Sequence, residues 1–320
     1  MPPNIVLYPT HGLANRLRAI ASAHILADYL GSKFRMRWRP EDACNCTFED
    51  LFETPVGHDG AHDGAHDGAH DGAHDGAHDG AEDSAPILYA PNTHTSTLLS
   101  ERAEECRAAG TLLISGGHEF KHPAMSEEAF VARKRAFYAS LRPTAAVRAL
   151  VDRWRDPSDV VAVHFRDYVP RFDQADGRVF HEVSPMEDFV AICRVIAARR
   201  PGARFAVFTN TDRARETLRA ALPAERLALP TAALPPDAGR DHTEGVRRAL
   251  ADMIVMSRCL LIVGTDMSSF SDEACFFGGA PKLCMALATN GPYHCHGAER
   301  YLGQRFVMLD RERVRDVFAV

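Results

Sequence analysis

The sequence lacks two features that would place a chain in or across a membrane. A bilayer span needs about 20 consecutive apolar residues, and no run in the 320 residues approaches that length. The opening residues Met1–Tyr8 also lack the basic stretch and long apolar run of a secretion signal. We therefore expect a chain without a membrane span, located in the cytoplasm.

An excess of one sign of charge is also missing from most of the chain. The formal net charge of −6 arises from six copies of His-Asp-Gly-Ala over residues 58–81, which carry six Asp and no Lys or Arg. The remaining 37 acidic residues equal the 37 basic residues in number. Such a balance gives no electrostatic reason to bind nucleic acid or an anionic membrane, so we expect neither as a partner.

The usual signs of a bound metal are absent as well. None of the eight Cys follows the paired spacing of a structural zinc site, and Cys44-Asn-Cys46 and His294-Cys-His296 come nearest to one. Cys259 lies in an apolar segment, where a free thiol behaves as a small buried hydrophobe. No Asp-x-Asp occurs that could hold a metal against a diphosphate. We expect no metal cofactor.

The pattern of apolar residues predicts an α/β fold. Short apolar runs predict strands and a 3.6-residue period predicts helices. The strands are expected at residues 5–8, 34–38, 87–89, 112–115, 160–165, 204–209, near 227, 259–263 and 282–286. The helices are expected at residues 16–30, 126–140, 144–155, 185–199, 212–221, 244–257 and 270–277. Regular alternation with short connections predicts parallel sheets covered by helices on both faces.

The length of the chain is comfortable for two such domains. We expect two doubly wound, Rossmann-like domains facing a cleft, at residues 1–150 and 151–320, with the boundary near 145–156. The first domain would carry residues 58–81 as a flexible insertion, because a Gly in every turn opposes a helix by about 1 kcal/mol each.

Arg166 is the first candidate for a functional side chain. Val160–Val163 are consecutive apolar residues, typical of a strand buried on both faces of a parallel sheet. Ligands bind at the carboxyl ends of such strands, and a guanidinium can meet two phosphate oxygens at once. His164 and Arg166 therefore predict an anion site, and an ordinary salt bridge at a strand end is the alternative for Arg166.

Two other segments have the same strand–loop–helix form. After the first strand, Gly12 permits a close backbone approach, and Asn15 and Arg16 begin a helix whose N-terminus favours anions. A surface turn with solvated Arg side chains is the alternative. After the strand at 204–209, Thr211 or Asp212 is expected to cap the next helix. A cap is favoured for Asp212, and a ligand contact nearby is the alternative.

The last such segment combines an acidic helix with a Ser-rich loop. Asp252 lies in an apolar helix, where a buried carboxylate would need a partner. Ser268 and Ser269 follow the next strand and open a helix, so hydroxyl and backbone N–H groups can surround a phosphate. Plain capping of that helix is the alternative for the Ser residues.

Taken together, these segments resemble the GDP-fucosyltransferase superfamily, which includes α1,6-fucosyltransferases, nodulation fucosyltransferases and protein O-fucosyltransferases. Its Gly-x-x-Asn-(Arg/Gln) motif is matched by Gly12-Leu-Ala-Asn15-Arg16, and its His-x-Arg motif by His164-Phe-Arg166. Its late motif, an Asp-bearing helix, a strand and a Ser-Ser loop, is matched in the segment just described. The order agrees over nearly the whole chain outside the repeat.

The resemblance implies a GT-B-like fold and an inverting, metal-independent transfer of fucose from GDP-fucose to a glycan or protein acceptor. The donor would bind mainly in the C-terminal domain, with Arg166 gripping the β-phosphate and stabilising the departing GDP. His164 and Asp252 would hold the nucleoside, and Ser268 and Ser269 the phosphate. From the other domain, two more residues would approach the donor, namely Asn15 and Arg16.

The sequence departs from the family pattern directly after Arg166. The family often carries a second Arg where this chain has Asp167, which would weaken the grip on phosphate. Asp173 and Asp176 are candidates for the catalytic base, and solvated loop charge explains them equally well. A non-catalytic relative that binds a GDP-sugar or glycan, or a transferase for another nucleotide sugar, is therefore the alternative function.

Deleting residues 58–81 should leave folding and GDP binding intact, because the repeat offers no side chains from which a core could be built. Circular dichroism and the thermal shift on adding GDP measure the two properties. A Gly-Ser segment of equal length in place of the repeat controls for loop length. Loss of soluble protein or of the GDP shift in the deletion would contradict this prediction.

Overall fold

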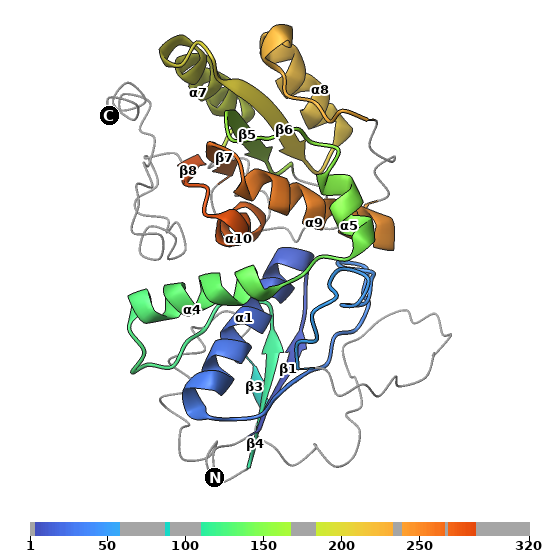
Figure 1. The fold of residues 1–320 in the computed structure, drawn as a ribbon, viewed down its shortest axis with the longest axis vertical. Coiled ribbons are helices and arrows are strands. Elements are labelled where there is room, and N and C mark those ends of the chain that lie inside the picture. Colours follow the sequence, from blue (N-terminus) through green and yellow to red (C-terminus); the bar gives the residue numbers. More distant parts are fainter. Residues whose placement is uncertain are drawn as a thin grey trace. The chain divides into compact units, whose positions relative to one another are not determined.

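The computed structural model describes residues 4–57, 87–89, 110–167, 184–232, 239–265 and 268–285. These residues form two compact units. One comprises the described residues within Met1–Arg39 and Thr54–Ser126, and the other those within Pro40–Glu53 and Glu127–Val320. Each unit contains a four-stranded sheet in which all neighbouring strands are parallel (Figure 1). The predicted α/β fold with parallel sheets is confirmed.

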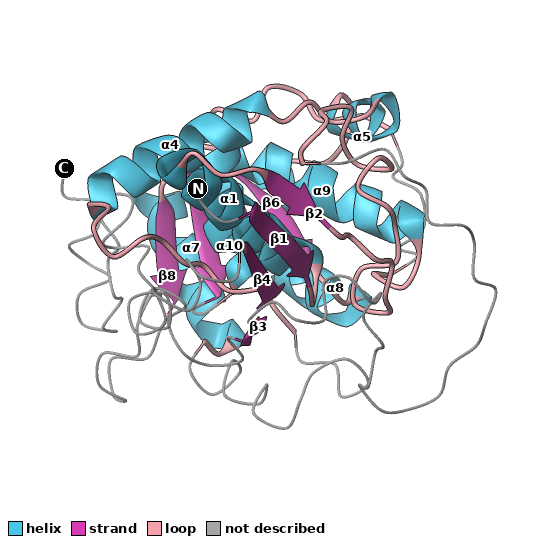
Figure 2. Cartoon of the chain, turned by 90° about the horizontal axis from the view of Figure 1, so that it is seen from below, coloured by secondary structure: helices cyan, strands magenta, loops and turns pink. Residues whose placement is uncertain are grey.

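The sheet of the first unit has the order β2-β1-β4-β3. Its strands are β1 (Asn4–Pro9), β2 (Phe34–Met36), β3 (Ile87–Tyr89) and β4 (Thr111–Gly116). Figure 2 shows β1, β2 and β4 side by side. Helix α1 (Leu13–Leu30) follows β1 and buries Leu17, Ile20 and Leu26. It ends at Gly31, whose left-handed φ of 64° is easily adopted only by a residue without a Cβ.

The sheet of the second unit has the order β6-β5-β7-β8. Its strands are β5 (Val160–Phe165), β6 (Arg204–Thr209), β7 (Leu261–Thr265) and β8 (Lys282–Met285). Every residue of β5 is buried, as expected for a strand covered on both faces. Two predictions need correction: β7 lies two residues later than expected, and Leu227 forms a single bridge to Phe205.

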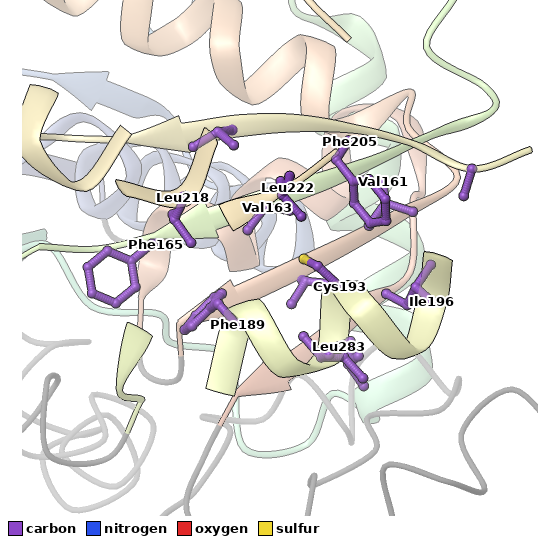
Figure 3. Packing of buried hydrophobic residues seen from close by; sticks show 14 of the residues in the cluster. Val161, Val163, Phe165, Phe189, Cys193, Ile196, Phe205, Leu218, Leu222 and Leu283 are labelled. Carbon is purple, nitrogen blue, oxygen red and sulfur yellow. The ribbon is translucent and has the colours of Figure 1, made fainter. Parts of the chain in front are cut away.

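Helices cover both faces of this second sheet. The alternate residues Val161, Val163 and Phe165 pack in one apolar cluster with residues of α7 (Met186–Arg199) and α8 (Asp212–Ala221) (Figure 3). The side chain of His164, which lies between Val163 and Phe165 in the strand, points to the opposite face of the sheet. There it stacks on Phe270 of α10 (Ser269–Gly278). Helix α9 (Thr243–Ser257) packs beside α10 and against β7.

Two further helices of the second unit precede its sheet, namely α4 (Glu127–Ser140) and α5 (Ala145–Val151). Buried groups join α4 to α10, where Lys134 Nζ and Tyr138 Oη donate to the Glu273 carboxylate over 3.0 and 2.6 Å. Helix α5 packs on α9. The predicted boundary at residue 150 therefore falls inside the second compact unit, because both helices pack on elements that follow it.

The buried residues of this fold include five free cysteines. Cys259 is among them, as the sequence predicts, and burial raises its thiol pKa to about 12. No helix among the described residues combines the length and the apolar character needed to cross a bilayer.

Candidate functional site

The site is built at the carboxyl edge of the second sheet. Strands β5, β6 and β7 are parallel neighbours, with Phe165 in register with Thr209. The residues that follow these strands therefore gather at one edge, although long stretches of sequence separate them. Arg166 comes directly after β5 and is partly exposed there. The strand end is thus where the sequence predicts it, at the place where parallel sheets bind ligands.

The Thr265 hydroxyl joins the ends of β5 and β7. This hydroxyl accepts a hydrogen bond from the Arg166 backbone N–H over 2.9 Å and donates one to the His164 carbonyl over 3.3 Å. The Thr265 carbonyl accepts from the Ser268 backbone N–H over 3.4 Å. Thr265 therefore brings Arg166 and Ser268 together. Sequence reasoning missed Thr265, because no local pattern indicates which strand will lie beside β5.

A buried ion pair lies behind this edge. Lys282 Nζ is 2.5 Å from Asp272 Oδ1 and donates to the Thr265 carbonyl over 3.1 Å, and Lys282 is fully buried. Gly264 allows this packing, since a Cβ there would lie 2.7 Å from Lys282 Cε and 2.8 Å from Ser271 Oγ. This pair was not predicted from the sequence, although a Lys inside an apolar strand is a signal for it.

His164 is buried and electrically neutral at physiological pH. Its ring stacks on Phe270 with centroids 5.2 Å apart, and among the described residues Nδ1 has no hydrogen-bond partner. Burial, together with the positive charges of Lys282 and Arg166, lowers the pKa of His164 to about 3. The imidazole can therefore take part in neutral hydrogen bonds, but it adds no charge to the site.

Asp167 stands where the family often has a second Arg, and its side chain contacts the residues that follow β6. Its side chain is 3% exposed and accepts from Thr211 Oγ1 over 2.6 Å and from Arg213 Nη2 over 3.3 Å. Asn210 completes the link through two hydrogen bonds with the Asp167 backbone, of 2.7 and 2.8 Å. The role of Asp167 in the described structure is to tie the ends of β5 and β6.

The same loop corrects the predicted helix cap. Thr211 is the N-cap of α8, and its hydroxyl accepts from the Ala214 backbone N–H over 3.3 Å. Asp212 is the first helical residue and forms an ion pair with Arg215. The preference for Asp212 as the cap was therefore wrong. Thr211 has the extended φ that a cap requires, and this depends on the path of the loop.

Ser268 and Ser269 lie at the N-terminus of α10, as predicted. Ser268 is the N-cap residue and is buried, yet its hydroxyl makes no capping hydrogen bond. Plain capping therefore does not account for this side chain. The helix N-terminus carries a partial positive charge that favours an anion. Phosphate binding by the two Ser residues remains a prediction.

Solved structures with a similar fold come from fucosyltransferases. Fucosyltransferase NodZ from Bradyrhizobium matches with a TM-score of 0.53 at 17% identity, over 86% of this chain and 93% of that chain. A NodZ α-1,6-fucosyltransferase soaked with GDP-fucose matches with a TM-score of 0.54 at 17% identity, over 91% and 97% of the two chains. A mutant of Arabidopsis thaliana FUT1 in complex with GDP matches with a TM-score of 0.55 at 14% identity, over 89% of this chain and 70% of that chain.

The chain has the fold of these fucosyltransferases. The resemblance predicted from the sequence motifs is thereby confirmed at the level of fold. No protein-family description matches the chain, and no curated protein matches it by sequence.

Two predicted donor-binding residues lie in the first unit of this fold. Arg16 is fully buried, with Nε donating to the His11 carbonyl over 2.8 Å and Nη1 to the Arg39 carbonyl over 2.5 Å. Its guanidinium also lies 4.8 Å from the centre of the Trp38 ring. These contacts give Arg16 a structural role in the first unit, so the alternative of a solvated Arg is wrong. Asn15 is partly buried, and donor binding by either residue remains a prediction.

The remaining candidates are placed less directly by the structure. Asp252 is partly exposed on α9 between buried neighbours, where the sequence analysis expected a buried carboxylate. Asp173 and Asp176 lie outside the described residues. The roles assigned to all three remain predictions.

Of the two metal-site candidates from the sequence, the structure describes only the one at Cys44 and Cys46. Cys44 and Cys46 are buried with their Sγ atoms 3.9 Å apart, and His294-Cys-His296 lies outside the described residues. Within the part of the chain that the structure describes, no group of three or more His, Cys, Asp or Glu side chains could hold a metal ion.

Replacing His164 with Phe should make the free energy of unfolding less sensitive to acid. The folded-state pKa of about 3 lies below the ordinary value of 6.5, so the unfolded chain binds a proton that the folded chain refuses. The wild type should therefore lose up to about 2 kcal/mol more than the variant between pH 7 and pH 5.

Urea unfolding at both pH values measures this difference. His24→Phe is a matched control, since His24 also stacks on a Phe ring, that of Phe34 at 6.2 Å. Equal loss of stability in the wild type and in His164→Phe would contradict the prediction.

Proposed function

We propose that the chain is a glycosyltransferase that transfers fucose from GDP-fucose to a glycan or glycoprotein acceptor. The observation that carries this proposal is the position of Arg166 at the carboxyl edge of a parallel sheet, where its backbone N–H donates to the Thr265 hydroxyl. The fold supports it, since similar structures are fucosyltransferases, one soaked with GDP-fucose and another in complex with GDP.

The proposed role of Arg166 follows from the charge of the donor. A diphosphate is anionic, and the phosphate that leaves with GDP gains negative charge as its bond to the sugar breaks. A guanidinium at the strand end can meet two phosphate oxygens and stabilise this charge. The N-terminus of α10, with Ser268 and Ser269, would offer N–H and hydroxyl donors to the same group.

The nucleoside would be held by groups that bind without taking part in the reaction. Neutral His164 suits this role, because an uncharged imidazole can hydrogen-bond to a base or ribose without attracting a phosphate away from Arg166. Asp252 would accept hydrogen bonds from guanine or ribose, as the family resemblance implies. Donor binding would thus reside mainly in the second unit, within a GT-B-like arrangement of two domains.

The proposed reaction is a single displacement. The acceptor hydroxyl oxygen attacks the anomeric carbon of fucose, and the bond from that carbon to the β-phosphate oxygen breaks. The configuration inverts, GDP departs with the bonding electrons, and the hydroxyl proton passes to a carboxylate base. Asp173 or Asp176 would be that base. Fixed protein cations would take the part that a metal plays in other transferases, consistent with a sequence that has no Asp-x-Asp.

Slow hydrolysis of GDP-fucose should be measurable without an acceptor and should persist in excess chelator. Release of GDP, followed by chromatography, measures this activity. UDP-, ADP- and CMP-linked sugars serve as controls for donor choice and should not be consumed. Loss of activity in chelator and its return with Mg²⁺ or Mn²⁺ would contradict the metal-free mechanism. Binding of GDP without any donor turnover would favour a non-catalytic relative.

Arg166→Ala should lower kcat by roughly 10²–10³-fold, because removing one preformed electrostatic donor costs about 2.7–4 kcal/mol of transition-state stabilisation. Arg166→Lys should restore only part of the loss, since Lys supplies a point charge in place of two parallel donors. Both kcat and Tm are measured on the same preparation.

Arg258→Ala controls for loss of an exposed Arg, because Arg258 ends α9 and lies before β7, at the other end of the strand. It should leave kcat unchanged. A well-folded Arg166→Ala enzyme with near-normal kcat would support the ordinary salt-bridge alternative.

A further inference from the structure

The carboxyl edge carries a second cation that the sequence motifs do not identify. Arg213 lies in the first turn of α8, directly after β6, and its side chain is 81% exposed. Its guanidinium is hydrogen-bonded through Nη2, which lies 3.3 Å from both Asp167 carboxylate oxygens. Among the described residues, its side-chain hydrogen bonds involve Nη2 alone. The N–H groups on Nε and Nη1 therefore remain able to bind a ligand.

The charges at this edge explain why a second cation matters. Asp167 follows Arg166 directly, so these two residues alone have no net charge, and a carboxylate beside a diphosphate would repel it. Arg213 restores one positive charge and holds the Asp167 carboxylate on the β6 side. Asp212, the other acidic residue in this turn, is neutralised by its ion pair with Arg215. Among the described residues named here, the charges sum to +1 with Arg213 and to zero without it.

We propose that Arg213 binds the diphosphate of the donor together with Arg166, and that Asp167 is the positioning residue that aims it. This inference rests on the proposed function and adds a donor-binding residue to it. Thr211 donates to Asp167, and Asp167 in turn accepts from Arg213 Nη2, which places the guanidinium beside the end of β5. The remaining N–H groups on Nε and Nη1 can donate to phosphate oxygens, and the positive charge of Arg213 favours a diphosphate. The contact would form in both the ground state and the transition state, so it should affect GDP affinity and KM more than kcat.

Calorimetric titration of the full chain with GDP tests the proposal at about 0.05 M and about 0.5 M salt. Arg213→Gln removes the charge and keeps a polar side chain, whereas Arg213→Lys keeps the charge and loses the fork. Arg199→Gln is the matched control, because Arg199 is exposed at the end of α7, where the chain leads to the start of β6. Tm is recorded for each variant as a measure of folding.

Arg213→Gln should weaken GDP binding by about fivefold to tenfold at low salt and by less at high salt, since an exposed charge is screened. Arg213→Lys should recover part of the loss, and Arg199→Gln should bind like the wild type. Arg213→Lys and Arg199→Gln should leave Tm near the wild-type value, and Arg213→Gln should lower it only slightly, because buried Asp167 keeps its hydrogen bond from Thr211. A purely structural role would instead move Tm and leave GDP affinity unchanged.

Two negative results can be told apart. A wild-type chain that does not bind GDP would overturn the proposed function and this inference with it. A wild-type chain that binds GDP, with Arg213→Gln binding within twofold of it at low salt, would overturn the role of Arg213 alone.

Discussion

The parallel pairing of β5 with both β6 and β7 is the constraint on which the candidate site depends. It places three strand ends at one edge, so Arg166 meets Thr265, 99 positions away in the sequence, through a hydrogen bond of 2.9 Å. This hydrogen bond fixes the backbone of Arg166, and so the point from which its side chain extends. A site that must stabilise charge as a bond breaks benefits from such rigidity, because no reorganisation is needed during the reaction.

Buried charges on α10 support the same edge. Near the start of this helix Asp272 pairs with fully buried Lys282, and the next residue, Glu273, pairs with fully buried Lys134 of α4. Removing a charge from water is costly, and a buried carboxylate left alone would be strongly destabilising. Each carboxylate must therefore keep its partner, which holds α10 in one position against the sheet. The N-terminus of α10, with Ser268, is oriented as a result.

The sequence predicted most elements of the fold because their patterns are local. The buried run Val160–Val163 and the Gly31 stop after α1 depend on nearest neighbours alone, and both were predicted correctly. The strand expected at 259–263 lies at 261–265, because the apolar run starts at Cys259 but pairing with β5 starts only at Leu261. The predicted domain boundary at 150 separates α4 and α5 from the helices on which they pack. Those helices lie more than 90 positions later, and no local pattern indicates such packing.

What the sequence determined by itself was the α/β class, the parallel sheets and the strand ends that carry His164, Arg166 and Ser268. These follow from hydrophobic periodicity and from the order of short motifs along the chain. Only the tertiary structure decided which groups meet at those ends. Sequence separation gives no distance between residues. The hydrogen bond from the Arg166 N–H to Thr265, and that from Arg213 to Asp167, therefore depend on strand order. The neutral state of His164 was decided in the same way, because burial and the nearby cations set its pKa.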